Sequence, residues 1–151
     1  GEIFKNAGIP THVLGNIGVP ITQEAMQTQP GDVVVAETAA LQLDTIESYR
    51  PRESAILNIT EDHLDRYGTM ENYIAAKAKI FKNQTPEDYC VLNYDNEIVR
   101  ELEGQISAKV IWFSTEKVVE DGAFVEEGEI RFSLNGRKRN IMPAADFTFC
   151  N

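Results

Sequence analysis

Polar side chains lie at the ends of three apolar segments of this 151-residue chain. Glu37 closes the segment GDVVVAE, Asp62 and His63 follow SAILNIT, and Asn93 and Asp95 lie at the end of DYCVLNY. Carboxylate and imidazole groups are suitable ligands for a hard or borderline divalent cation. The spacing therefore indicates a possible metal site, provided that the fold brings the segment ends together.

Each of these residues also has an ordinary structural interpretation. Glu37 could solvate the end of a strand, and Asp62 and Asp65 could cap a following helix, where the helix dipole favours acidic groups. Lys77 could be a solvated lysine on a helix whose other face carries an apolar stripe that includes Tyr73. On composition and spacing alone, the structural interpretation is favoured, because short motifs often match by chance.

The elements that position these side chains are predicted from the apolar pattern. Strands are expected over residues 9–15, 31–37, 54–60, 88–94 and 108–114, and helices over residues 42–49, 70–83 and 95–104. Continuous apolar runs are typical of strands buried on both faces of a parallel sheet. The alternation predicts an α/β fold with a doubly wound, mostly parallel sheet and helices on both faces, whose ligands bind beyond the carboxyl ends of the strands.

The pattern changes near the C-terminus. Residues 119–143 alternate apolar and polar side chains around Asn135-Gly136, which is a strong signal for a tight hairpin turn. We therefore expect a small antiparallel hairpin appended to the edge of the sheet. The length is typical of one domain, so residues 1–151 are predicted to form a single domain.

Composition excludes several classes of function. With 14 basic and 24 acidic residues the net charge is -10, and no basic cluster is longer than Arg137-Lys138-Arg139, so nucleic-acid binding is disfavoured. Cys90 and Cys150 fit neither a disulfide framework nor a zinc motif. No apolar run has the length of a membrane span and no signal peptide is recognisable, so we expect a cytoplasmic protein that does not bind membranes.

Four segments, in this order and at these separations, resemble the central domain of the Mur ligases. They are GNIGVP (15–20), VAETAALQLDT (35–45), ILNITEDHLDRYGTMENYIAAKAKIF (56–81) and VLNYDNE (91–97). The resemblance runs from residue 1 to about residue 143, and TMENYIAAKAKIF favours the branch that adds D-glutamate. It implies an ATP-dependent ligase that forms an amide bond on a UDP-sugar substrate, UDP-N-acetylmuramoyl-L-alanine, in peptidoglycan synthesis.

The resemblance also implies a magnesium site. Glu37 matches a glutamate that binds a magnesium ion beside the ATP phosphates, and His63 matches a catalytic histidine near a second magnesium ion. Lys77 matches a catalytic lysine that is carbamylated and holds the second ion. Carbamylation needs a neutral amine, which desolvation by packing through Ala75 and Ala76 would favour, and it yields the oxygen ligand that magnesium prefers.

Other matched positions concern the two large substrates. Asn16 and Gln42, together with His63, match residues that contact the UDP-sugar. Asn93 and Asp95 lie where the family has a segment near the nucleotide. The intact enzyme is accordingly expected to bind ATP, the UDP-sugar and D-glutamate, and to act as a monomer.

The sequence departs from the family in three places. No G-x-x-x-x-G-K-[ST] phosphate-binding loop occurs, Ala39-Ala40-Leu41 replaces the usual Ser-Ser-Phe, and the last segment AADFTFCN does not match. The chain is therefore expected to be a partial central, ATPase-type domain that forms no amide bonds alone. Two alternatives remain open: a truncated, non-catalytic binding module, or another amide ligase of the superfamily such as a folylpolyglutamate synthase.

Overall fold

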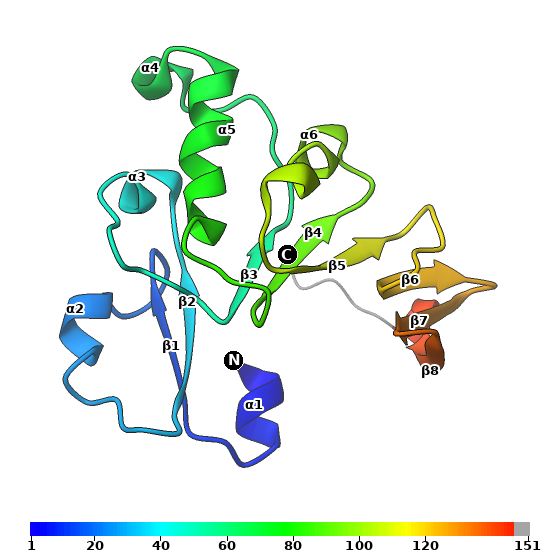
Figure 1. Cartoon of the computed structure of the whole chain (residues 1–151). Helices are drawn as coiled ribbons and strands as arrows, with labels where there is room; N and C mark the ends of the chain where they lie inside the picture. The colour runs from blue at the N-terminus through cyan, green and yellow to red at the C-terminus, as the bar shows by residue number, and fades with distance from the viewer. Residues whose placement is uncertain (147–151) are drawn as a thin grey trace. The chain divides into compact units, whose positions relative to one another are not determined.

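The computed structural model describes residues 1–146, and its internal contacts divide the chain into two compact units. The first unit comprises Gly1–Thr45, and the second begins at Ile46. Each unit has a sheet of its own (Figure 1). Cys90 is buried as a free thiol, whereas Cys150 lies outside the described residues.

Two parallel strands organise the first unit. They are β1 (Thr11–Gly15) and β2 (Val33–Glu37), and they pair along their whole length, so that Gly15 lies opposite Glu37. The helices of this unit are α1 (Glu2–Asn6), α2 (Ile21–Glu24) and α3 (Ala40–Leu43). Its buried apolar side chains are Leu14, Ala40 and Leu43.

Among the described residues of the second unit, six strands form its sheet, in the same order as in the chain (Figure 1). They are β3 (Glu53–Ile56), β4 (Tyr89–Asn93), β5 (Lys109–Ser114), β6 (Gly122–Glu126), β7 (Glu129–Leu134) and β8 (Arg137–Pro143). Strands β3 to β6 are parallel, and β7 and β8 each run antiparallel to the strand before. The predicted α/β fold, with a mostly parallel sheet and antiparallel strands near the C-terminus, is confirmed.

Helix α5 (Met70–Ala78) is the longest helix within residues 1–146. The Thr69 hydroxyl caps its first turn by accepting a hydrogen bond from the Asn72 amide at 3.3 Å. The other helices of this unit are α4 (Leu64–Tyr67), α6 (Glu97–Arg100) and the 3₁₀ turns η1 (Lys79–Phe81), η2 (Glu103–Gln105) and η3 (Ala144–Asp146). In the described part of the chain, no helix has the length and apolar character needed to cross a membrane.

Two tight turns join the antiparallel strands. Asn135 and Gly136, between β7 and β8, both have positive φ angles, of 51° and 73°. Glu127 and Gly128, between β6 and β7, have the same conformation, with φ angles of 52° and 77°. Two residues with positive φ form the turn that suits the twist of antiparallel strands. The Asn-Gly sequence correctly predicted the turn between β7 and β8. The Glu-Gly turn was not predicted, because glutamate is uncommon at positive φ.

Side-chain amides from distant segments shorten two predicted elements. The strand predicted over residues 54–60 ends at Ile56, because the carbonyls of Leu57 and Ile59 accept from the side chains of Asn93 and Asn96. The helix predicted over residues 42–49 is wrong beyond Leu43. There, Asn83 donates to the carbonyls of residues 47 and 49, and the residue before Pro51 avoids helical geometry.

The helix predicted over residues 95–104 is also wrong in extent. Asn96 caps α6 by accepting from the Val99 amide at 3.0 Å, so the helix starts at Glu97 and ends at Arg100. A separate 3₁₀ turn, η2, follows. A cap that precedes the first helical residue therefore sets the boundary more sharply than the apolar pattern could.

Candidate functional site

Glu37 and Asn16 lie together at the carboxyl end of the two strands of the first unit. The Asn16 amide donates to the Glu37 carbonyl at 2.8 Å, and Asn16 Nδ2 approaches Glu37 Oε1 at 3.4 Å. Gly15 permits this approach, because it has a φ of 114° and a Cβ there would lie 2.2 Å from the Glu37 carbonyl oxygen. The Glu37 carboxylate is exposed, so it is available to an ion or ligand.

Gln42 has a local structural role in helix α3. Its Oε1 accepts a hydrogen bond from the Ala39 amide at 2.8 Å and so caps the first turn. This is half of a capping box, since Ala39 has no hydroxyl to bond back to the Gln42 amide. The prediction that Gln42 contacts a UDP-sugar stays a prediction, and its side-chain oxygen already has a partner.

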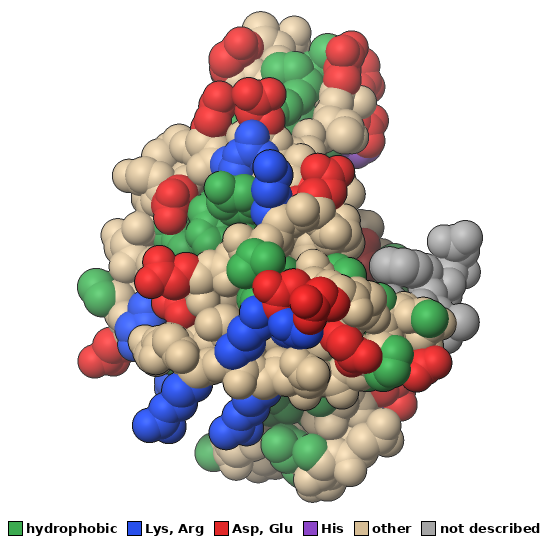
Figure 2. Space-filling model, turned by 90° about the vertical axis from the view of Figure 1, so that its right-hand side faces the viewer, with side chains coloured by type: hydrophobic (Ala, Val, Ile, Leu, Met, Phe, Trp, Pro, Cys, Tyr) green, Lys and Arg blue, Asp and Glu red, His purple; other side chains and the backbone are tan. Residues whose placement is uncertain are grey.

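His63 lies in the second unit, at the start of α4, with a left-handed backbone (φ 52°, ψ 26°). Its amide donates to Asp62 Oδ1 at 2.8 Å, and its Nε2 lies 3.6 Å from Asp62 Oδ2. The imidazole is 58% exposed. Figure 2 shows acidic side chains gathered over the α4 and α5 end of this unit.

The ring of Tyr73 contacts both predicted catalytic residues. The His63 ring meets it edge-on, with centroids 5.8 Å apart and planes at 74°. Lys77 Nζ lies over the same ring, 5.1 Å from its centroid. The structure therefore brings His63 and Lys77 to one place. The structural interpretation that placed Tyr73 on the opposite face of the helix from Lys77 is wrong. The two residues are four apart and therefore share one helix face.

The packing expected around Lys77 is only partly present. Ala76 is buried, with 3% of its surface exposed, whereas Ala75 is exposed to solvent. Lys77 itself is half-buried. The amine of Lys77 contacts the ring of Tyr73 on the same face of α5.

Asn93 and Asp95 hold segments of the second unit together. Asn93 donates to the Leu57 carbonyl at 2.9 Å and accepts from the Asp95 amide at 2.8 Å. The Asp95 carboxylate accepts from the hydroxyl of Ser114 and from the amide and hydroxyl of Thr115. Burial raises the pKa of Asp95, but these hydrogen bonds outweigh it, and the pKa lies below its usual range. The sequence does not single out Ser114 and Thr115, because isolated serine and threonine residues form no recognisable motif.

The oxygen atoms that these side chains could offer are ligands of the type that magnesium binds. An exposed carboxylate at Glu37 and a carbamate at Lys77 would both supply the oxygen ligands that magnesium prefers. Within residues 1–146 no three His, Cys, Asp or Glu side chains gather as a ready-made metal site.

A second polar cluster, unnoticed in the sequence, surrounds Asp88. Arg50 Nε and Nη2 donate to its two carboxylate oxygens at 2.8 and 3.1 Å, and the Thr85 amide donates at 2.7 Å. The arginine and then the Thr85 amide lower the pKa of this buried carboxyl to about 2. The cluster joins the segment before β3 to the start of β4, so its role is structural.

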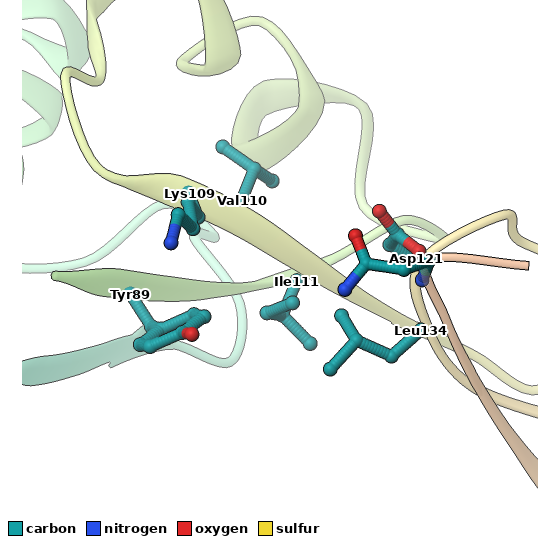
Figure 3. A pocket seen from close by; sticks show the side chains of 7 residues that line it. Tyr89, Lys109, Val110, Ile111, Asp121 and Leu134 are labelled. Atoms are coloured by element: carbon teal, nitrogen blue, oxygen red, sulfur yellow. Dashed lines mark hydrogen bonds between the residues drawn. The ribbon is translucent and has the colours of Figure 1, made fainter. Parts of the chain in front are cut away.

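A pocket of about 290 Å³ opens elsewhere on the second unit (Figure 3). It is lined by Tyr89, Lys109, Val110, Ile111, Asp121, Leu134 and Asn135. Tyr89 and Lys109 are the first residues of β4 and β5, whereas Asn93 closes β4 at its other end. The pocket thus lies at the amino ends of the strands, and no predicted site residue lines it.

Comparison with known proteins places these residues in a family. Residues 2–148 match the Mur ligase middle domain. The UDP-N-acetylmuramoylalanine--D-glutamate ligase of Alkaliphilus oremlandii is 50% identical over 146 residues, which is 97% of this chain and 32% of that protein. The corresponding ligase of Clostridioides difficile is 50% identical over 137 residues, 91% of this chain and 30% of that protein. The chain thus spans about a third of the length of these relatives.

Solved structures show the same fold. MurF from Acinetobacter baumannii aligns with 94% of this chain and 34% of its own, at a TM-score of 0.66 and 16% identity. MurF from Thermotoga maritima, solved in complex with ADP, aligns with 92% of this chain and 42% of its own, at a TM-score of 0.53 and 14% identity. Because the family match covers nearly every residue and two relatives share half of the aligned sequence, the chain belongs to the Mur ligase family.

Proposed function

We propose that this chain is part of an ATP-dependent ligase that joins D-glutamate to UDP-N-acetylmuramoyl-L-alanine in peptidoglycan synthesis. The observation that carries the proposal is 50% identity, over 97% of the chain, to a ligase whose name states that reaction. The gathering of His63 and Lys77 around one ring supports it independently. The ADP complex of a structural neighbour is consistent with use of a nucleotide.

The proposed reaction has two steps. The carboxylate of the sugar-linked alanine attacks the γ-phosphorus of ATP, which gives an acyl phosphate and releases ADP. The amine of D-glutamate then attacks the acyl carbon and loses a proton, so that an amide bond forms and phosphate leaves. Magnesium, when bound, would supply neutralisation of the phosphate charge.

The residues of this chain have distinct proposed roles in that reaction. Glu37 would offer its carboxylate to a magnesium ion beside the ATP phosphates, with Asn16 holding it in place. Lys77 would add carbon dioxide at its neutral amine, losing a proton, and the resulting carbamate would hold a second ion. His63 would bind near that ion and the UDP-sugar, since its exposed ring can reach a ligand in solution.

Three further residues are proposed to shape the substrate sites. Gln42 would present its amide nitrogen to the UDP-sugar, because its oxygen caps α3. Asn93 and Asp95 would act near the nucleotide mainly by fixing the loops at the ends of β3, β4 and β5. A monomeric, cytoplasmic enzyme that is inactive in the form of this chain alone remains our prediction.

A chimera tests the proposal directly. The segment of the Clostridioides difficile ligase that matches this chain would be replaced by this chain, and phosphate release would be measured with ATP, the UDP-sugar and D-glutamate. We expect release that depends on D-glutamate. Glu37→Gln and Lys77→Ala should each lower it by about 100-fold, since several kcal/mol of charge stabilisation at the phosphates would be lost.

Matched variants separate this result from general damage. Glu101→Gln and Lys82→Ala change exposed residues of the same types and should leave the rate unchanged. A chimera that folds but releases no phosphate would contradict the proposal and favour the non-catalytic binding module. Release that depends on a different amino acid or acceptor would favour another amide ligase of the superfamily.

A further inference from the structure

Tyr73 is the shared contact of the two residues proposed to act at the second metal ion. Only 5% of its surface is exposed, so its position is set by packing. Its ring and the imidazole of His63 make a T-shaped contact, and Lys77 Nζ lies over its face, 5.1 Å from the ring centroid. One buried ring therefore contacts two side chains that come from different segments.

Local structure holds this ring in place. Tyr73 and Lys77 lie one turn apart on α5, so the lysine can lie over the ring without distortion of the helix. The Tyr67 ring packs against Tyr73 at 5.5 Å. Asn72 Nδ2 donates to the Tyr67 carbonyl at 2.9 Å, which ties the end of α4 to the first turn of α5.

His63 is held from the other direction. Its left-handed backbone and the hydrogen bond from its amide to Asp62 fix the point from which the imidazole projects. The ring of Tyr73 then limits its rotation. A lysine side chain is far more flexible, and its contact with the aromatic face reduces the number of conformers it samples.

We propose that Tyr73 is a positioning residue that aligns His63 and Lys77 toward the same divalent cation. The proposal rests on the proposed function, which makes His63 and Lys77 neighbours of that ion. Tyr73 itself touches neither metal nor substrate in this scheme. Groups that orient metal ligands commonly change metal affinity by 10- to 100-fold when they are removed, which sets the scale of the expected effect.

Two variants of the chain separate the ring from the hydroxyl. Tyr73→Leu removes the ring, whereas Tyr73→Phe keeps it. NMR would follow the ε-methylene protons of Lys77, assigned with Lys77→Arg, and the ring protons of the two histidines, His12 and His63. We expect upfield-shifted Lys77 protons in the wild type and in Tyr73→Phe, since they lie over an aromatic face, and ordinary shifts in Tyr73→Leu.

Manganese then reports on the cation site. Mn²⁺, a paramagnetic substitute for magnesium, would be titrated in bicarbonate buffer while line broadening of the histidine signals is recorded. We expect broadening at His63 but not at His12, which belongs to the first unit and pairs with Asp32. The Mn²⁺ concentration needed should rise about 10-fold or more in Tyr73→Leu and less than 2-fold in Tyr73→Phe.

Tyr89→Leu is the matched control, because Lys109 Nζ lies over the Tyr89 ring at 5.3 Å, far along β4 from its carboxyl end. It should leave the His63 response unchanged. Lys77 shifts like those of the exposed Lys82 in the wild type would overturn the positioning role even if Tyr73→Leu does not fold. Equal Mn²⁺ responses in the wild type and in Tyr73→Leu would also overturn it. If instead the Lys77 protons of the wild type are shifted upfield but Mn²⁺ does not broaden the His63 signals, the role of His63 beside a metal ion would be refuted.

Discussion

Lys77 and His63 show which residue contacts a sequence can reveal. Lys77 lies four residues after Tyr73 in a helix, so their contact follows from helical spacing alone. The contact of His63 with Tyr73 does not, because it depends on the chain reversal at Gly68, which has a φ of 76° and separates α4 from α5. Of the two contacts of the Tyr73 ring, only the one with Lys77 could therefore be predicted from the sequence.

Asp88 should make the stability of the chain depend on pH. Its carboxyl has a pKa of about 2 in the folded state, below the ordinary 3.8, mainly because Arg50 donates to it. A carboxyl with a lowered folded pKa adds stability that is complete above its unfolded pKa and disappears as pH falls through its folded pKa. This contribution should be complete above about pH 4 and vanish between about pH 4 and 2.

Urea unfolding between pH 2 and 6 would measure this effect. Asp88→Asn should be less stable than the wild type above pH 4, and the two midpoints should converge near pH 2. Glu101→Gln, at an exposed position, should show no such convergence. A constant difference between Asp88→Asn and wild type over the whole range would show that the Arg50 pair does not depend on the charge of Asp88.

Strand positions and helix ends differ in how far the sequence determines them. The central strands β4 and β5 were predicted within one residue at each end, because buried parallel strands are continuous apolar runs. The end of β3 was not, since Asn93 and Asn96 take the carbonyls that a longer strand would have used. Boundaries set by side chains far away in sequence are invisible to a local pattern.

Helix α3 is expected to gain stability from one added hydroxyl. Ala39 has extended geometry at the N-cap (φ -75°, ψ 152°), and Gln42 already provides the returning half of a capping box. Ala39→Ser would let a hydroxyl share the Gln42 amide, which now donates to the Ala39 carbonyl at 2.9 Å, and should stabilise the helix by about 0.5 kcal/mol. Hydrogen exchange of the Gln42 and Leu43 amides would measure it.

The control for this change has the opposite sign. Ala75→Ser places the same substitution at an exposed interior position of α5, where serine forms helix less readily than alanine, and should cost about 0.5 kcal/mol or less. Unchanged or faster exchange in Ala39→Ser would mean that the added hydroxyl does not complete the cap.

The two compact units of the molecule differ greatly in their cores. Within residues 1–45, all of them described, the buried apolar side chains are Leu14, Ala40 and Leu43. The second unit buries large side chains on several elements, including Ile59, Leu92, Leu102 and Phe124. Units near 40 residues with small cores are marginally stable. The fold class followed from the sequence, but this unequal division did not, because similar apolar strands occur in both units.

Hydrogen exchange should reveal this difference in the intact chain. We expect the amides of β1 and β2 to exchange at least about 10-fold faster than those of β4 and β5, because a small core opens at low free-energy cost. Mass spectrometry of peptides from residues 11–37 and 89–114 would measure both. Equal protection in the two sets would show that the units open together and that the first unit does not depend on its own core.

The strand order of the larger sheet has a consequence for protein synthesis. Each strand from β4 to β8 pairs with the strand made just before it, so no strand must wait for a partner that has not yet left the ribosome. The sheet can therefore grow in the direction of translation. Among the described residues β8 is the outermost strand of this sheet, and the exposed charges of Arg137, Lys138 and Arg139 discourage the addition of a strand from a neighbouring nascent chain.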